Sequence, residues 1–81
     1  MNATEIFDKV KEIVSPYCKN KEALEAATND TSFLEDLSVN SARLVDIVID
    51  FEDEFDIEVE DEEADNIRTI GNAVNTILAK I

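Results

Sequence analysis

Three observations in the sequence predict an all-α fold. Apolar residues recur at three- and four-residue steps in every long segment, which is the period of one buried face of a helix. The chain has one glycine and one proline, too few for the turns of an all-β fold. Hydrophobic residues make up 44% of its 81 residues, enough for a compact fold. We therefore expect residues 1–81 to form one small helical domain.

The first helix is expected over residues 2 to 15. Asn2 is followed three places on by Glu5, the spacing of a capping box with Asn as the cap. Pro16 disfavours helical geometry at the residue before it, so the helix should end or kink at Ser15. The buried stripe consists of Ile6, Val10, Ile13 and Val14, with Phe7 beside it.

A long connection follows, from residue 17 to residue 31. Within it, residues 21 to 27 are good helix formers and Asn20 is a possible cap, so one or two extra helical turns are expected. Ser32 and Glu35 have the spacing of a second capping box, which would open a single turn. The apolar residues of that turn are expected to plug the core; they are Phe33, Leu34 and Leu37.

The next helix, from Ser41 to about Phe55, organises the chain. Asn40 is a strong N-cap candidate, and Ser41 then falls at the helix N-terminus, where unpaired N–H groups and the helix dipole favour a phosphate. On spacing alone, however, a serine at this position is usually a cap or a solvated residue. The buried stripe consists of Leu44, Ile47, Val48, Phe51 and Phe55.

Val45 and Ile49 follow Ser41 at four-residue steps, so all three share one face of this helix. Two interpretations stay open for the apolar pair. They could widen the contact with the core, or they could form a small exposed strip that docks partner proteins. Carboxylates flank the strip at Asp46, Asp50 and Asp53, and apolar residues inside a charged rim are a common construction of interfaces.

Two further helices complete the expected fold. A short one is predicted over residues 60 to 67, with Ala64 and Ile67 facing inward and acidic residues at its N-terminal end. Thr69 is the expected cap of the last helix, and Gly71 near its start lowers helix stability relative to alanine. The apolar stripe of that helix consists of Ile70, Ala73, Val74, Ile77, Leu78 and Ile81.

Charge excludes several classes of function. Twenty acidic residues against seven basic ones give a net charge of −13, the wrong sign for binding a nucleic-acid backbone or an anionic membrane. A basic protein partner is the natural complement. From residue 46 to residue 65 there are twelve acidic residues and no basic one, which favours loose divalent-cation binding. A calcium loop starting at Glu52 would need glycine where Ile57 stands, so no specific metal site is expected.

No catalytic constellation is present in the sequence. The chain has no histidine, hence no Ser-His or Cys-His pair, and it lacks a glycine-rich phosphate loop, so we expect no enzyme activity. Cys18 is alone, which predicts a partly buried, unreactive thiol and a reducing compartment. With no apolar run long enough for a membrane span and no signal peptide, a cytoplasmic location is expected. We also expect the protein to be a monomer.

The run from Ser32 to Ser41, the acidic helix and the segment from Phe55 to Ala64 together resemble the acyl carrier proteins. In that family an Asp-Ser-Leu triplet carries 4′-phosphopantetheine on its serine. Here the triplet is Asn40-Ser41-Ala42, which points to a specialised member. The resemblance covers roughly residues 28 to 78. It implies a four-helix bundle of three longer helices and one short helix. Members of the family usually have a plain loop in the first connection, where residues 20 to 27 of this chain predict an extra helical turn.

The resemblance also implies a function. A phosphopantetheinyl transferase would attach the arm to Ser41, and acyl groups would be carried on it as thioesters to enzymes of fatty acid, lipid or polyketide synthesis. Basic patches on those enzymes would dock at Val45, Asp46, Ile49, Asp50 and Asp53. The bundle would shelter the acyl chain among residues such as Leu44, Val48, Phe51 and Ile67. A carrier of aminoacyl or peptidyl groups and an acidic interaction module that never receives an arm remain as alternatives.

Overall fold

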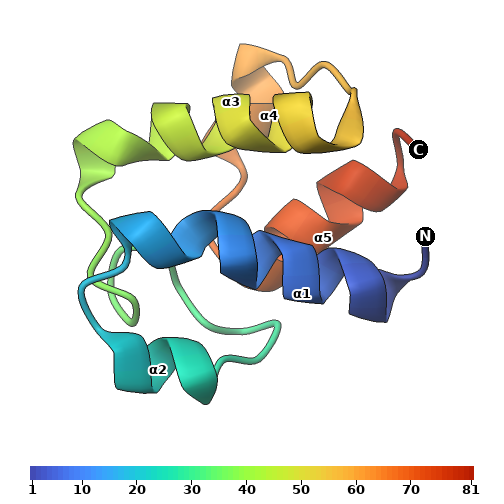
Figure 1. Cartoon of the computed structure of the whole chain (residues 1–81). Coiled ribbons are helices and arrows are strands. Elements are labelled where there is room, and N and C mark those ends of the chain that lie inside the picture. The colour runs from blue at the N-terminus through green and yellow to red at the C-terminus, as the bar shows by residue number, and fades with distance from the viewer.

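The computed structural model describes residues 1–81 and is built of helices and loops (Figure 1). In chain order the elements are α1 Ala3–Val14, the 3₁₀ turn η1 Ser15–Tyr17, α2 Lys21–Glu25, the 3₁₀ turn η2 Ser41–Arg43, α3 Leu44–Phe55, α4 Asp61–Asp65 and α5 Ile70–Leu78. The only β-type pairing is an isolated bridge between Ser32 and Thr69. The predicted all-α class is confirmed, with three longer helices, one short helix and the extra helix α2 in the first connection.

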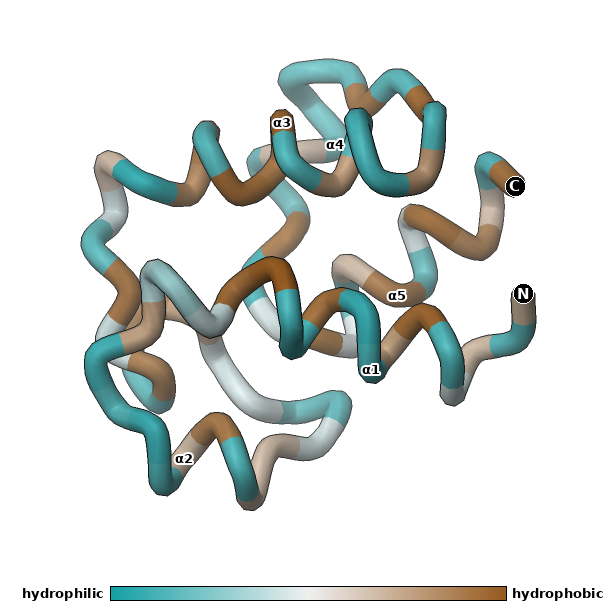
Figure 2. The backbone as a smooth tube through the Cα atoms, in the orientation of Figure 1, coloured by the Kyte–Doolittle hydropathy of each residue, from teal (hydrophilic) through white to brown (hydrophobic).

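The three longer helices surround one hydrophobic core. Figure 1 shows α1 and α5 side by side with α3 above α1, while α2 lies apart on the other side of α1. Hydrophobic and hydrophilic residues alternate along α1, α3 and α5 at helical spacing (Figure 2). The core is formed by buried residues of these helices and of the loops between them: Ile6, Val10, Val14, Cys18, Leu24, Phe33, Leu37, Val39, Ile47, Val48, Phe51, Phe55, Ile67, Ile70, Ala73, Val74 and Ile77.

Side-chain caps place most of the helix starts where the sequence predicts them. The Asn2 side chain accepts a hydrogen bond from the Glu5 backbone N–H at 2.9 Å, although Glu5 does not complete a capping box. Asn20 caps α2 by accepting from the Ala23 N–H at 3.1 Å. Helix α1 ends at Val14, and Pro16 lies within the 3₁₀ turn that follows. These bonds satisfy N–H groups that a helix start would otherwise leave without a partner.

The turn that begins at Ser32 differs in part from the prediction. The Ser32 hydroxyl accepts a hydrogen bond from the Glu35 N–H at 3.2 Å, as in a capping box. The Ser32 N–H, however, donates to the Asp36 carboxylate at 2.7 Å and not to Glu35. Phe33 and Leu37 are fully buried, as expected. Leu34 is 43% exposed, so its prediction as a core residue is wrong. Residues four apart share a face of a turn, which puts Phe33 and Leu37 inward and leaves Leu34 beside them.

Residues 29 to 33 run along the start of α5 and are bound to it by backbone hydrogen bonds. The Gly71 N–H donates to Asn29 O at 2.9 Å, the Ile70 N–H donates to Thr31 O at 3.0 Å, and the Phe33 N–H donates to Arg68 O at 3.1 Å. A Cβ atom on Gly71 would lie 2.8 Å from the Asn29 carbonyl oxygen. Glycine therefore permits this close approach, a role that helix propensity does not reveal.

Helix α4 is shorter than predicted and makes little buried contact with the bundle. It spans Asp61–Asp65 and has no fully buried residue, but Ala64 packs partly buried against the core and Ile67 just after the helix is buried, both as expected. A capping box between Glu60 and Glu63 begins the helix, and the Glu60 N–H donates to the Glu63 carboxylate at 3.2 Å. The Val59 N–H, just before the helix, donates to the Glu52 carboxylate of α3 at 3.0 Å.

Candidate functional site

Ser41 lies at the first position of η2, the 3₁₀ turn that leads into α3. Asn40 caps this turn: its side-chain oxygen accepts from the Ala42 N–H at 2.9 Å, and its backbone oxygen accepts from the Arg43 N–H at 2.8 Å. The Ser41 side chain is exposed and its hydroxyl forms no hydrogen bond within the chain. The local sequence thus fixes the backbone of the serine while leaving its hydroxyl free to react.

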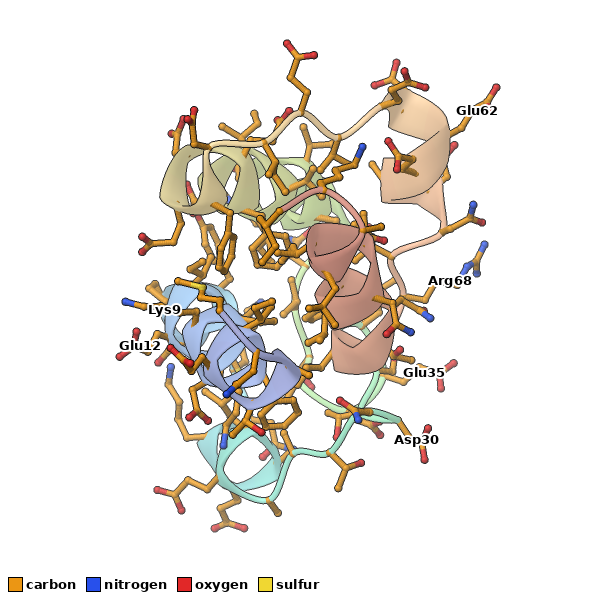
Figure 3. All side chains as sticks on the ribbon, turned by 90° about the vertical axis from the view of Figure 1, so that its right-hand side faces the viewer. Lys9, Glu12, Asp30, Glu35, Glu62 and Arg68 are labelled. Carbon is orange, nitrogen blue, oxygen red and sulfur yellow. The ribbon has the colours of Figure 1, made fainter.

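Ser41 also lines a groove of about 690 Å³ between α3, the turn at residues 32 to 36 and the connection from α4 to α5. Ligand pockets commonly have volumes of about 300–1,000 Å³. The apolar lining consists of Leu34, Leu44, Val45, Val48, Ala64 and Ile67. Charged lining residues lie at the rim, and Figure 3 shows Asp30, Glu35 and Arg68 projecting outward on this side of the molecule.

Three of the four residues expected to line the groove do so. Leu44, Val48 and Ile67 line it as predicted. Phe51 does not, because its side chain is fully buried between the helices. Leu34 takes part instead, which explains why it is exposed rather than packed into the core. An exposed, unbonded serine hydroxyl beside an apolar groove fits the attachment of a flexible arm that ends in an apolar group.

The apolar strip beyond Ser41 is exposed. Val45 is 66% and Ile49 is 47% exposed, so neither widens the core contact, and the first of the two interpretations is excluded. The three carboxylates beside the strip differ from one another. Asp46 forms an ion pair with Arg43 at 3.0 Å, Asp50 accepts from another side chain, and Asp53 is exposed without an ion-pair partner.

The partner of Asp50 is Tyr17, which lies in η1 at the end of α1. The Tyr17 hydroxyl donates to the Asp50 carboxylate at 2.7 Å and joins the start of the first connection to the middle of α3. Donation to this carboxylate raises the pKa of Tyr17, because ionisation would remove the donated proton and place two negative charges together. The periodicity of either helix gives no signal for this contact.

Cys18 is buried, and its thiol donates to the backbone oxygens of Asn20 at 3.1 Å and Leu37 at 3.2 Å. The prediction of a buried thiol is confirmed. No group of three or more acidic or sulfur side chains converges to hold a metal ion. None of the helices is long and apolar enough to cross a membrane.

Comparisons with known proteins agree with this geometry. The model of the family described as "Phosphopantetheine attachment site" matches residues 8–77. The chain is 42% identical over 81 residues to an acyl carrier protein of Petrotoga mobilis, covering 100% of this chain and 93% of that one. It is 36% identical over 77 residues to an acyl carrier protein of Lactobacillus acidophilus, covering 95% and 94%. A solved structure of the acyl carrier protein from Enterococcus faecalis superimposes with a TM-score of 0.81 at 31% identity, covering 100% of both chains.

Proposed function

We propose that Ser41 bears the prosthetic arm of this protein, because the chain belongs to the acyl carrier protein family, whose members carry acyl groups on covalently attached 4′-phosphopantetheine. Members of this family are carriers and not catalysts. The observation that supports the assignment most is the Ser41 side chain itself. It is exposed, makes no hydrogen bond within the chain, and lines the apolar groove.

The arm supplies a terminal thiol that holds acyl groups as thioesters. Each part of the chain has a physical task in this function. Asn40 fixes the turn that presents the Ser41 hydroxyl to a phosphopantetheinyl transferase. Apolar groove residues such as Leu44, Val48 and Ile67 would cover an acyl chain and keep water from it, since burial of apolar surface is favourable.

Removal of the hydroxyl tests the assignment. The wild-type chain, Ser41→Ala and Ser38→Gly are each incubated with coenzyme A and a broad-specificity phosphopantetheinyl transferase, and their intact masses are measured. Ser38 is a matched control, because it is exposed near Ser41 and its φ of 55° suits glycine. We expect one arm on the wild type and on Ser38→Gly, and none on Ser41→Ala. An arm on Ser41→Ala would refute the assignment.

We also propose that partner enzymes dock on the exposed strip, through Val45, Asp46, Ile49, Asp50 and Asp53. Its support is the exposure of the apolar pair together with the flanking carboxylates, which complement a basic surface. Asp46 and Asp53 are the better positions to reverse, because changing Asp50 would break its part-buried bond with Tyr17, whereas changing Asp46 breaks only an exposed ion pair with Arg43.

The test measures arm transfer by the same transferase at several salt concentrations. The double variant Asp46→Lys with Asp53→Lys should lower kcat/KM and weaken its salt dependence, since long-range attraction mainly accelerates association. The control is Asp8→Lys, which reverses one exposed charge on α1. Unchanged kinetics in the double variant would place the docking surface elsewhere.

The relatives and the single cysteine indicate what this protein carries and where it works. The named relatives are acyl carriers, so we favour acyl groups of fatty acid, lipid or polyketide synthesis over aminoacyl groups. A single reduced cysteine is typical of a reducing compartment, which supports a cytoplasmic location. Acyl-handling enzymes are then the partners that meet the strip. A carrier that must present this face to several of them in turn is best served by remaining a monomer.

A further inference from the structure

Helix α4 forms part of the wall of the groove but is weakly held by the core. Ala64, Asp65, Ile67 and Arg68, within and just after α4, all line the groove. Yet α4 contributes no buried side chain, and it spans only Asp61–Asp65. So short a helix has little stability of its own. Its position must therefore depend on contacts made by its individual side chains.

One of these contacts comes from the end of the chain. Lys80 lies just after α5, in a turn where its N–H donates to Ile77 O at 3.0 Å. Its ammonium group forms an ion pair with the Glu63 carboxylate at 2.8 Å. The Lys80 side chain is 24% and the Glu63 side chain 37% exposed, so this pair is better shielded from water than the other two ion pairs of the chain.

The same Glu63 oxygen that binds Lys80 also accepts from the Glu60 N–H at the start of α4. One carboxylate thus joins the cap of α4 to the end of α5. Both bonds favour the charged form and hold the pKa of Glu63 below its ordinary value. Helix α4 is therefore held at its start to α3 through Glu52 and at its end by buried Ile67. On its inner face, Ala64 packs partly buried against the core, and the ion pair joins the helix to the end of α5.

We propose that Lys80 is a positioning residue of the groove: through Glu63 it holds α4 in the place where the groove can shelter an acyl chain. This inference rests on the proposed function, because it concerns the chain carried on Ser41. Without the pair, α4 would open more often, and a long acyl chain would be less well covered. A short acyl group, which does not reach the groove lining, would not be affected.

The key variant is Lys80→Met, which keeps an apolar stem and removes only the charge. Lys80→Arg restores the charge and should restore the wild-type behaviour. Lys9→Met is the matched control, because it removes the cation of the exposed Lys9–Glu12 pair on α1. Figure 3 shows Lys9 and Glu12 on the opposite side of the molecule from Glu62 of α4 and Arg68.

The first measurement is hydrogen exchange of the chain without its arm. The amides of Ala64, Asn66 and Ile67 donate within and after α4, so they report on its opening. In Lys80→Met they should exchange about two- to fivefold faster than in wild type, the effect expected from losing a partly exposed ion pair. In Lys9→Met and Lys80→Arg their rates should be unchanged. Equal rates in Lys80→Met and wild type would overturn the proposal.

The second measurement uses chains loaded with a decanoyl or an acetyl group. Hydroxylamine should cleave the decanoyl thioester about two- to fivefold faster in Lys80→Met than in Lys9→Met, with the acetyl thioester equal in both. Faster exchange without faster decanoyl cleavage would overturn the groove role. If no arm attaches to wild type, the proposed function fails and the groove role fails with it. The exchange result, obtained without the arm, still decides whether Lys80 holds α4.

Discussion

Substitution of Gly71 by alanine provides a sharp test of the packing between the first long connection and α5. Gly71 is the second residue of this helix, where propensity alone predicts that alanine would be stabilising by about 1 kcal/mol. The structure predicts the opposite sign. The added Cβ would lie 2.8 Å from Asn29 O, closer than real Cβ atoms approach an oxygen, and 3.0 Å from Asn29 Cβ, which is an unusually tight contact.

The magnitude follows from what must move. The nearest atom is a backbone oxygen, which also accepts the Gly71 N–H at 2.9 Å. The same segment is bound to Ile70 of α5 through Thr31 and to Arg68, just before α5, through Phe33. Overpacking at such a site typically costs about 1–3 kcal/mol. After subtraction of the propensity gain, we expect a net loss of about 1 kcal/mol, or a Tm lower by about 4–8 °C in a domain of this size.

Thermal unfolding followed by circular dichroism measures this difference. Asn75→Ala is the control, because Asn75 is exposed one turn further along α5 and its side chain makes no hydrogen bond. Alanine there should raise the stability by a few tenths of a kcal/mol, about the propensity difference. If Gly71→Ala raised Tm as the control does, the close approach to Asn29 would not constrain the fold.

Three further predictions concern charge and hydrogen bonding. Tyr17→Phe should lower Tm by about 2–5 °C at neutral pH, because it removes the hydrogen bond to Asp50. In the wild type the free energy of unfolding should fall as pH rises through the raised pKa of Tyr17, and this fall should be absent in Tyr17→Phe. Because the pKa of Glu63 is lowered, its ion pair with Lys80 stabilises the fold above the ordinary pKa of glutamate. This stabilisation is lost as pH falls through the lowered pKa, so the free energy of unfolding should fall less in that pH range in Lys80→Met than in the wild type. Of the twelve carboxylates from residue 46 to residue 65, only two form ion pairs, so the remaining ones repel each other. Sodium chloride or magnesium should therefore raise Tm by screening this repulsion. A Tm independent of ionic strength would show that the repulsion is negligible.

Features set by local sequence could be predicted from it. The apolar stripes of α1, α3 and α5 specify the helices and most of their buried faces, although Leu78 and Ile81 of the last predicted stripe are exposed. The caps at Asn2 and Thr69 fix where α1 and α5 begin. Periodicity places Ser41, Val45 and Ile49 on one face, because a helical repeat decides which residues share a face, but it leaves open whether the apolar pair is buried or exposed. Even α2 was predictable, since its residues are good helix formers after a capping Asn.

Features that arise only when distant segments meet could not be predicted. Leu34 lines the groove and Phe51 does not, because that choice depends on how the turn at residue 32 packs against α3. The bonds of Tyr17 to Asp50 and of Lys80 to Glu63 join residues far apart in the chain. Neither pair has a spacing that periodicity could detect.

The central claim, that this chain carries its arm on Ser41, is tested most directly by locating the modification itself. The wild-type chain is coexpressed with a broad-specificity phosphopantetheinyl transferase, digested, and sequenced by tandem mass spectrometry. We predict that the fragment ions place the whole added mass on Ser41, with every other serine and threonine unmodified. An arm on any other residue, or a chain that stays unmodified while a known carrier in the same cells is fully modified, would contradict the claim.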